Sequence, residues 1–139
     1  MTLGREDKEA LSDIRFEKAS EFLEDARANF KENRLRTSIS RSYYAALNAA
    51  RSLLVLEGVD TETHGGAITV VSLRFVKPGL LPVEILKNMK ILLSRRTDVD
   101  YGDFESIDMA EARDSIGKAE NTLKLINDLR KRMIEDLTD

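Results

Sequence analysis

Apolar residues recur every three or four positions along nearly the whole chain, and this spacing is the feature that most restricts the fold. The alternation of apolar and polar residues that marks a half-buried strand is not found, and the β-branched run at 69–71 stands alone among helical segments. The sequence therefore predicts an all-α protein, an up-and-down bundle of about five helices. The expected helices cover roughly 6–32, 37–57, 65–76, 82–95 and a last segment that begins after 108.

The last of these segments has the clearest helical pattern. Asp108, followed three residues later by Glu111, has the form of a capping box in which aspartate replaces serine or threonine. An apolar seam follows, and it could pack within the bundle or against a second subunit. The residues of the seam are Met109, Ala112, Ile116, Ala119, Leu123, Ile126 and Met133.

Length and composition fit one folded unit over 1–139. A chain of 139 residues has room for one core, and 42% hydrophobic with 34% charged residues suits a folded helical protein. No apolar run approaches the roughly 20 residues of a membrane span, and the charged N-terminus does not resemble a signal peptide. Without cysteine, disulfides and thiolate chemistry are excluded. We expect a cytoplasmic protein with no membrane partner.

The net charge of −3 conceals an uneven distribution. Residues 34–96 carry ten basic and four acidic side chains, a local balance of +6, while the remaining residues carry twelve basic and twenty-one acidic ones, or −9. A basic groove for a phosphate-bearing ligand would explain this distribution. Acidic outer helices that pair with basic inner helices would also explain it, and composition alone favours this second interpretation.

One run in the second predicted helix combines small residues with tyrosine and arginine: Arg41-Ser-Tyr-Tyr-Ala-Ala-Leu-Asn-Ala-Ala-Arg51. Steps of three and four residues place Arg41, Tyr44, Asn48 and Arg51 on one helix face. The opposite face, which includes Tyr43, is apolar and is predicted to lie in the core. The polar face is a candidate surface for a ligand or a protein partner, and Tyr44 could stack on a base.

Three further motifs follow this run along the chain: His64-Gly65, Arg74-Phe-Val-Lys77 and Arg95-Arg96-Thr-Asp-Val-Asp-Tyr101. The order and spacing of the run and these motifs resemble the HEPN superfamily (higher eukaryotes and prokaryotes nucleotide-binding) in its small, single-domain prokaryotic branch. The resemblance covers roughly 13–130. It implies a helical bundle that is often dimeric. Many relatives are toxin or antitoxin partners of a small nucleotidyltransferase, and several branches are ribonucleases.

The ribonuclease signature of that superfamily is an arginine followed, after four to six residues, by a histidine. Histidine transfers protons near neutral pH, and arginine holds phosphate and stabilises charge in the transition state. The chain has one histidine, His64, and positions 57–59 before it are glutamate, glycine and valine. The signature is therefore absent around this histidine. In relatives, the Tyr-Tyr-Ala helix commonly carries a histidine where Asn48 stands here, and asparagine cannot shuttle a proton.

The segment that most resembles the catalytic region is 95–101, where Asp100 stands in the place of the histidine. An aspartate with an ordinary pKa of about 4 is a poor general acid at neutral pH, although it can act as a base or a hydrogen-bond acceptor. A structural explanation is equally available, in which Arg95 or Arg96 pairs with Asp98 or Asp100 to fix the end of the fourth helix. The candidate catalytic residues are Arg96, Asp100, Tyr101 and His64. The candidate ligand or partner face consists of Arg41, Tyr44, Asn48, Arg51 and Arg95.

Cofactor and metal motifs are not found in the sequence. There is no phosphate-binding loop and no His-Glu-x-x-His zinc motif. The acidic residues at 98, 100, 103 and 105 lack the glycine and the terminal glutamate of a calcium loop, so we expect a solvated loop with no metal and no cofactor.

Three functions stay open at this point. The preferred hypothesis is a HEPN-like binding or regulatory module that forms a homodimer and pairs with a small nucleotidyltransferase, as in toxin–antitoxin systems. The first alternative is an RNA-cleaving toxin, a metal-independent endoribonuclease whose site is assembled in a dimer. The second alternative is a protein that binds a nucleotide without catalysis.

Overall fold

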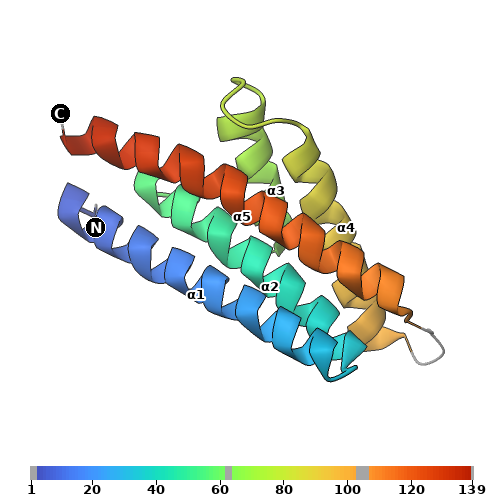
Figure 1. The fold of residues 1–139 in the computed structure, drawn as a ribbon. Helices are drawn as coiled ribbons and strands as arrows, with labels where there is room; N and C mark the ends of the chain where they lie inside the picture. Colours follow the sequence, from blue (N-terminus) through green and yellow to red (C-terminus); the bar gives the residue numbers. More distant parts are fainter. Residues whose placement is uncertain (1–2, 62–63, 103–106, 139) are drawn as a thin grey trace.

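The structure is a computed structural model, and it describes residues 3–61, 64–102 and 107–138. The described residues form helices and connecting turns and contain no strand, so the predicted all-α bundle of five helices is confirmed (Figure 1). The helices are α1 (Arg5–Lys31), α2 (Leu35–Leu54), α3 (His64–Val71), α4 (Glu84–Tyr101) and α5 (Met109–Thr138). A 3-10 turn (Val55–Glu57) follows α2, and a π-helical turn (Ser72–Val76) follows α3.

Helix α2 is the central element of the bundle. It packs against α1, α3, α4 and α5, and Figure 1 shows α1, α2 and α5 running side by side. Hydrogen bonds at both ends fix α1 antiparallel to α2: Ser12 Oγ donates to the Ser52 carbonyl at 2.6 Å, and Ser38 Oγ donates to the Ala26 carbonyl at 2.8 Å. Because each serine is buried, these bonds satisfy groups that water cannot reach.

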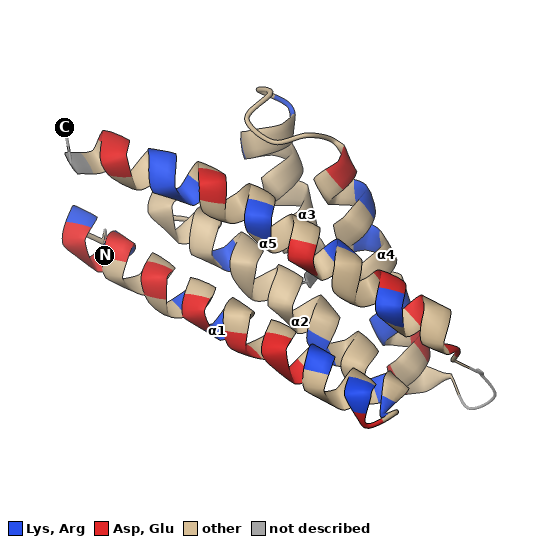
Figure 2. Cartoon of the chain, in the orientation of Figure 1, with Lys and Arg blue, Asp and Glu red and all other residues tan. Residues whose placement is uncertain are grey.

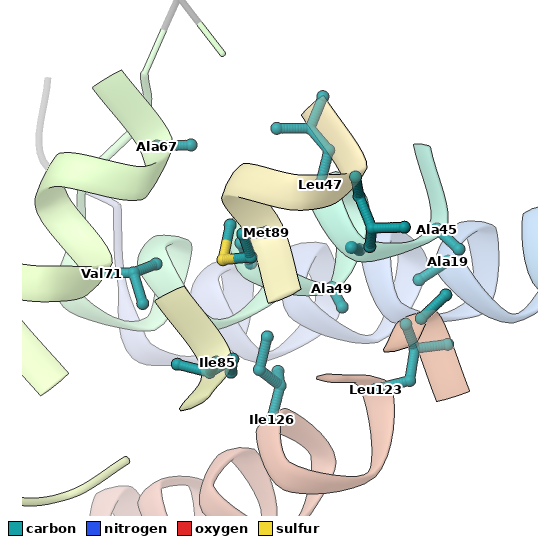
Figure 3. Packing of buried hydrophobic residues seen from close by; sticks show 14 of the residues in the cluster. Ala19, Ala45, Leu47, Ala49, Ala67, Val71, Ile85, Met89, Leu123 and Ile126 are labelled. Carbon is teal, nitrogen blue, oxygen red and sulfur yellow. The ribbon is translucent and has the colours of Figure 1, made fainter. Parts of the chain in front are cut away.

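Small side chains allow the close approach of several helices to α2. Its alanines are buried, and Figure 3 shows Ala45 and Ala49 beside Ala19 of α1 and Leu123 and Ile126 of α5. Bulky residues of the surrounding helices, including Phe75 after α3 and Leu92 of α4, fill the remaining space. The core therefore surrounds α2 on most of its circumference, and only one face of this helix reaches the surface.

The apolar seam of α5 packs within the bundle, which decides between the two packings that the sequence allowed. Ala112, Ala119 and Ile126 are fully buried, and Leu129 fills the interval before Met133. Met109, at the start of the seam, stays 48% exposed. The predicted cap is present, since the Glu111 backbone N–H donates to Asp108 Oδ1 at 2.7 Å.

The expected limits of two helices were wrong. Helix α2 begins at Leu35, two residues earlier than expected, and leaves α-helical geometry after Leu54 in a 3-10 turn that stops at Gly58 with a positive φ of 72°. Helix α4 continues to Tyr101 instead of ending near Arg95. No residue that breaks a helix occurs between Pro82 and Gly102.

Candidate functional site

The polar face predicted on α2 is present. Arg41, Tyr44, Asn48 and Arg51 are each half-buried, whereas the residues between them are buried. Helix α2 contains three arginines and no carboxylate, so its charge is unbalanced within the helix (Figure 2). The partners of this face must therefore come from neighbouring elements, and they differ between its two ends.

At the N-terminal end of the face, Arg96 of α4 joins the two tyrosines of α2. Arg96 Nη2 donates to Tyr44 Oη at 3.0 Å, across 52 residues of sequence. The guanidinium lies 5.8 Å from the ring centre of Tyr43 and 5.6 Å from that of Tyr44. The two rings meet edge to face at 5.2 Å. A cation held against two aromatic rings is a favourable arrangement.

Asp100 completes the environment of Arg96. Its Oδ2 lies 2.8 Å from Arg96 Nε, one helical turn along α4. Partial burial opposes the charged form of Arg96, but Tyr44 and Asp100 outweigh this effect and raise the guanidinium pKa above its usual range. Burial also raises the pKa of the Tyr43 hydroxyl well above its usual value. Both groups therefore keep one protonation state near neutral pH.

Phe22 of α1 and Arg41 extend this cluster. The Phe22 ring lies 5.7 Å from the Tyr44 ring, and the Arg41 guanidinium lies 5.7 Å from the Phe22 ring centre. We define the α2–α4 face as Arg41, Tyr44, Arg96, Asp100 and Tyr101. Nothing in the spacing of Phe22 along the sequence indicated a site.

A shallow groove of about 320 Å³ lies along the α2–α4 face. Its lining joins the first turns of α2 to the last turn of α4, and Arg36 Nη1 donates to the Val99 carbonyl at 3.4 Å across it. The groove exposes the guanidinium groups of Arg36 and Arg41 and the carboxylate of Asp100. This arrangement suits a polar surface of another molecule. The lining residues are Arg36, Thr37, Ser40, Arg41, Val99 and Asp100.

Arg95, next to Arg96, belongs to a different interface. Its Nη1 donates to Asp114 Oδ2 at 2.8 Å and to Ser115 Oγ at 3.0 Å, and its Nε lies 3.5 Å from a Glu111 carboxylate oxygen. A hydrogen bond from Lys118 has the largest effect on the pKa of Asp114 and lowers it, and a hydrogen bond from Arg95 lowers it further. Arg95 therefore links α4 to α5. The geometry gives no support for including Arg95 in the candidate ligand or partner face.

The C-terminal end of the α2 face opens into a second, larger groove of about 560 Å³, which we call the α1–α2 groove. Asn48 and Arg51 line it from α2, and its other walls come from α1 and from the connection after the 3-10 turn. The Asn48 amide donates to the Tyr44 carbonyl at 2.9 Å within its own helix. The complete lining is Leu11, Ile14, Arg15, Lys18, Asn48, Arg51, Asp60 and Thr61.

The structure gathers only some of the predicted site residues. Arg41, Tyr44, Arg96 and Asp100 come together, and Tyr101 follows on the same helix end with 75% of its surface exposed. The backbone of His64 begins α3, but its side chain lies outside the described part of the structure.

Sequence reasoning missed the contribution of α1 to the second groove. Arg15 and Lys18 share a helical face with Leu11 and Ile14, and this spacing of three and four residues was the available signal.

Two further properties concern metals and membranes. Among the described residues, no group of three side chains could hold a metal ion. The acidic cluster of the sequence includes residues 103 and 105, which lie outside the described residues.

No helix in the described part of the chain combines the length and the apolar character needed to cross a bilayer.

Comparison with known proteins identifies relatives of this chain. The sequence pattern of the HEPN domain family matches residues 12–129. A UPF0332 protein of Thermotoga maritima is 31% identical over 131 residues, which cover 94% of this chain and 96% of the relative. A UPF0332 protein of Pyrococcus horikoshii is 41% identical over 61 residues, or 44% of this chain and 43% of the relative. A protein of Methanocaldococcus jannaschii, described as a candidate toxin, is 32% identical over 77 residues, covering 55% of this chain and 54% of its own.

These matches agree with the helical bundle and with the order of the motifs along the chain. The family pattern spans α1 to α5, so it covers the elements that build the α2–α4 face. The resemblance that the sequence suggested is confirmed, and the chain belongs to the HEPN domain family.

Proposed function

We propose that this protein is a HEPN binding module of the toxin–antitoxin type, and that its α2–α4 face receives a small nucleotidyltransferase protein. The observation that carries the proposal is the state of Arg96, whose guanidinium is engaged by Tyr44 at 3.0 Å and by Asp100 at 2.8 Å. An arginine with these neighbours fixes the shape of a surface. The same engagement competes with the role of a catalytic arginine, which needs free donors for a phosphate.

The chemistry of the α2–α4 face also favours binding over cleavage. RNA hydrolysis needs a group that accepts and returns a proton near neutral pH. Burial raises the pKa of Tyr43, and Asn48 cannot transfer a proton. The exposed Tyr101 and the half-buried Arg41 supply what a protein interface commonly uses, because tyrosine and arginine are enriched at such interfaces.

The family supports the proposal that the module is of the toxin–antitoxin type. A relative from Methanocaldococcus jannaschii is described as a candidate toxin, and the HEPN resemblance implies a nucleotidyltransferase partner and a homodimer. Since the seam of α5 is buried within the protomer, a homodimer of this chain would use another surface.

Co-elution tests the partner. The protein should form a complex in size-exclusion chromatography with a small nucleotidyltransferase encoded in the same genome. Arg41→Glu should abolish co-elution because it reverses a charge at the centre of the face. Lys124→Glu, on the exposed side of α5, is the matched control and should leave the complex intact. Unchanged co-elution of the Arg41 variant would place the interface elsewhere.

An RNA-cleaving toxin is the second candidate, and the relative from Methanocaldococcus jannaschii is described as a candidate toxin, without a stated target. Arg96, Asp100 and Tyr101 lie together within the last two turns of α4. Incubation of the purified protein and of Arg96→Ala with total RNA separates the two functions. Cleavage by the wild type alone would make the protein an enzyme, and intact RNA in both samples supports the binding module.

A further inference from the structure

The cations of the α1–α2 groove lack the short contacts that several other arginines between helices have. Arg27 lies 2.9 Å from Glu120, Arg95 lies 2.8 Å from Asp114, and Arg130 lies 2.6 Å from Asp13. In the groove, by contrast, Arg15 approaches Asp60 only to 3.4 Å. Charge-assisted hydrogen bonds are ordinarily about 2.7–2.9 Å long, so this pair is a weak one.

Arg51 is also poorly satisfied. Its Nη2 reaches the Thr61 carbonyl at 3.4 Å, a long contact, and its buried Nε has no hydrogen-bond partner among the described residues. The hydroxyl of Thr61, also buried, has no partner there either. Unsatisfied buried polar groups are costly, and in a native protein each one calls for an explanation.

The charge of the groove is positive although the chain as a whole is negative. Arg15, Lys18 and Arg51 line it together with a single carboxylate, that of Asp60. Within the described part of the chain, neither Lys18 nor Arg51 forms an ion pair. Three cations that converge on a hollow with one anion repel one another, and an anionic ligand would relieve this repulsion.

The chemistry of the lining residues indicates which class of ligand would fit the groove. Two guanidinium groups match the oxygens of a phosphate, because their donors form a fixed fork, and an ammonium adds a point charge. Leu11 and Ile14 form an apolar wall beside the cations, and Ile14 is 55% exposed. A volume of about 560 Å³ exceeds that of a phosphate alone and lies in the range of small-ligand sites.

We infer that the α1–α2 groove is a binding site for the phosphate group of a small phosphate ester, held by Arg15, Lys18 and Arg51, with the organic part of the ester against Leu11 and Ile14. This site is separate from the α2–α4 face and does not rest on the function proposed for that face.

The test uses nuclear magnetic resonance titration of the full chain in low-salt buffer, with three probes: adenosine monophosphate, inorganic phosphate and adenosine. The nucleotide should give saturable shifts of amide signals from α1 and α2, and adenosine should give none. Inorganic phosphate should bind more weakly; equal binding would identify the free anion as the ligand of the same site. Adenosine binding as strong as that of the nucleotide, or no binding by either phosphate, would overturn the inference.

Substitutions at two exposed residues of the groove should change the affinity for the nucleotide in opposite directions. Lys18→Gln should weaken nucleotide binding about fivefold, and Asp60→Asn should strengthen it about threefold, because each changes one charge contact worth roughly 1 kcal/mol or less. Lys124→Gln removes a lysine outside the groove and should change nothing. Because both lining residues are exposed, neither change disturbs the core. Equal effects of the Lys18 and Lys124 variants would exclude the groove as the site.

Discussion

The α2–α4 face and the α1–α2 groove are built from the same face of one helix, yet the contacts of their arginines differ in length. Around Arg96 the polar contacts measure 2.8 and 3.0 Å, although its Nε, like that of Arg51, makes no aligned hydrogen bond among the described residues. Around Arg51 and Arg15 they measure 3.4 and 3.5 Å. Short contacts and aromatic rings hold Arg96 in the first region, whereas the contacts of the second region are long. The neighbouring helix, α4 at one end and α1 at the other, therefore decides how closely the arginines along this face are held.

The largest expected effect tests how firmly the first region is packed. Tyr43→Ala should lower the free energy of unfolding by about 3 kcal/mol, since it removes a buried aromatic ring from the core. Ile14→Ala, in the wall of the open groove, should change it by less than about 0.5 kcal/mol because this side chain is exposed. Urea denaturation measures both. Similar losses for the two variants would remove the distinction between a packed and an open region.

The two arginines give the next largest difference. Arg96→Ala should cost about 2 kcal/mol of stability because it removes a charged hydrogen bond and its aromatic contacts. Arg51→Ala should cost less than about 1 kcal/mol, since its contacts are long. The comparison of their denaturation midpoints is the measurement. A larger loss for the Arg51 variant would show that the groove is a structural element.

A double-mutant cycle sharpens the assignment of the Tyr44–Arg96 contact. Tyr44→Phe and Arg96→Ala, alone and combined, should give a coupling energy of about 1 kcal/mol because the hydroxyl accepts a hydrogen bond from the guanidinium. The control cycle of Asn48→Ala with Arg96→Ala should give a coupling near zero, as the Asn48 amide donates to its own helix. Additive effects in the first cycle would contradict the contact.

The smallest expected effect on stability concerns the contact between Arg95 of α4 and Asp114 of α5. The pKa of Asp114 is lowered in the folded protein by hydrogen bonds from Lys118 and Arg95. Its stabilisation is therefore complete above the ordinary value of 3.8 and is lost as the pH falls through the lowered value. Asp114→Asn should cost about 0.5 kcal/mol at neutral pH, a small figure because the side chain is 45% exposed.

Denaturation of the Asp114 variant and the wild type from neutral pH downward checks this sign. The difference between the two proteins should shrink as the pH falls below 3.8. A difference that stays constant with pH would assign the stabilisation to packing.

Much of the fold was predictable because it depends on local patterns. The spacing of apolar residues located the five helices, Gly58 marked the stop after α2, and Asp108 marked the start of α5. The end of α4 was harder to predict. Arg96 and Asp100 stabilise it through a contact one turn apart, and a polar segment of this kind resembles a loop as much as a helix.

The site was predictable only in part. The face of α2 followed from helical geometry, but nothing local distinguished Arg95 from its neighbour. The structure directs Arg95 to α5 and Arg96 to α2, because successive residues of a helix point about 100° apart. Arg15 and Lys18 became visible as part of a groove only when α1 lay against α2.

Local sequence patterns specify the helices and the apolar stripes that bury α2, and they show that no arginine stands at the required spacing before the single histidine. These features depend on residues within a few turns of one another. Which arginines have short contacts with partners, by contrast, depends on how the helices pack. Tyr44 and Arg96 are 52 residues apart, and the packing of four helices around α2 sets which side chains meet. Contacts of this range arise from the burial of whole helix faces, so no short sequence pattern encodes them.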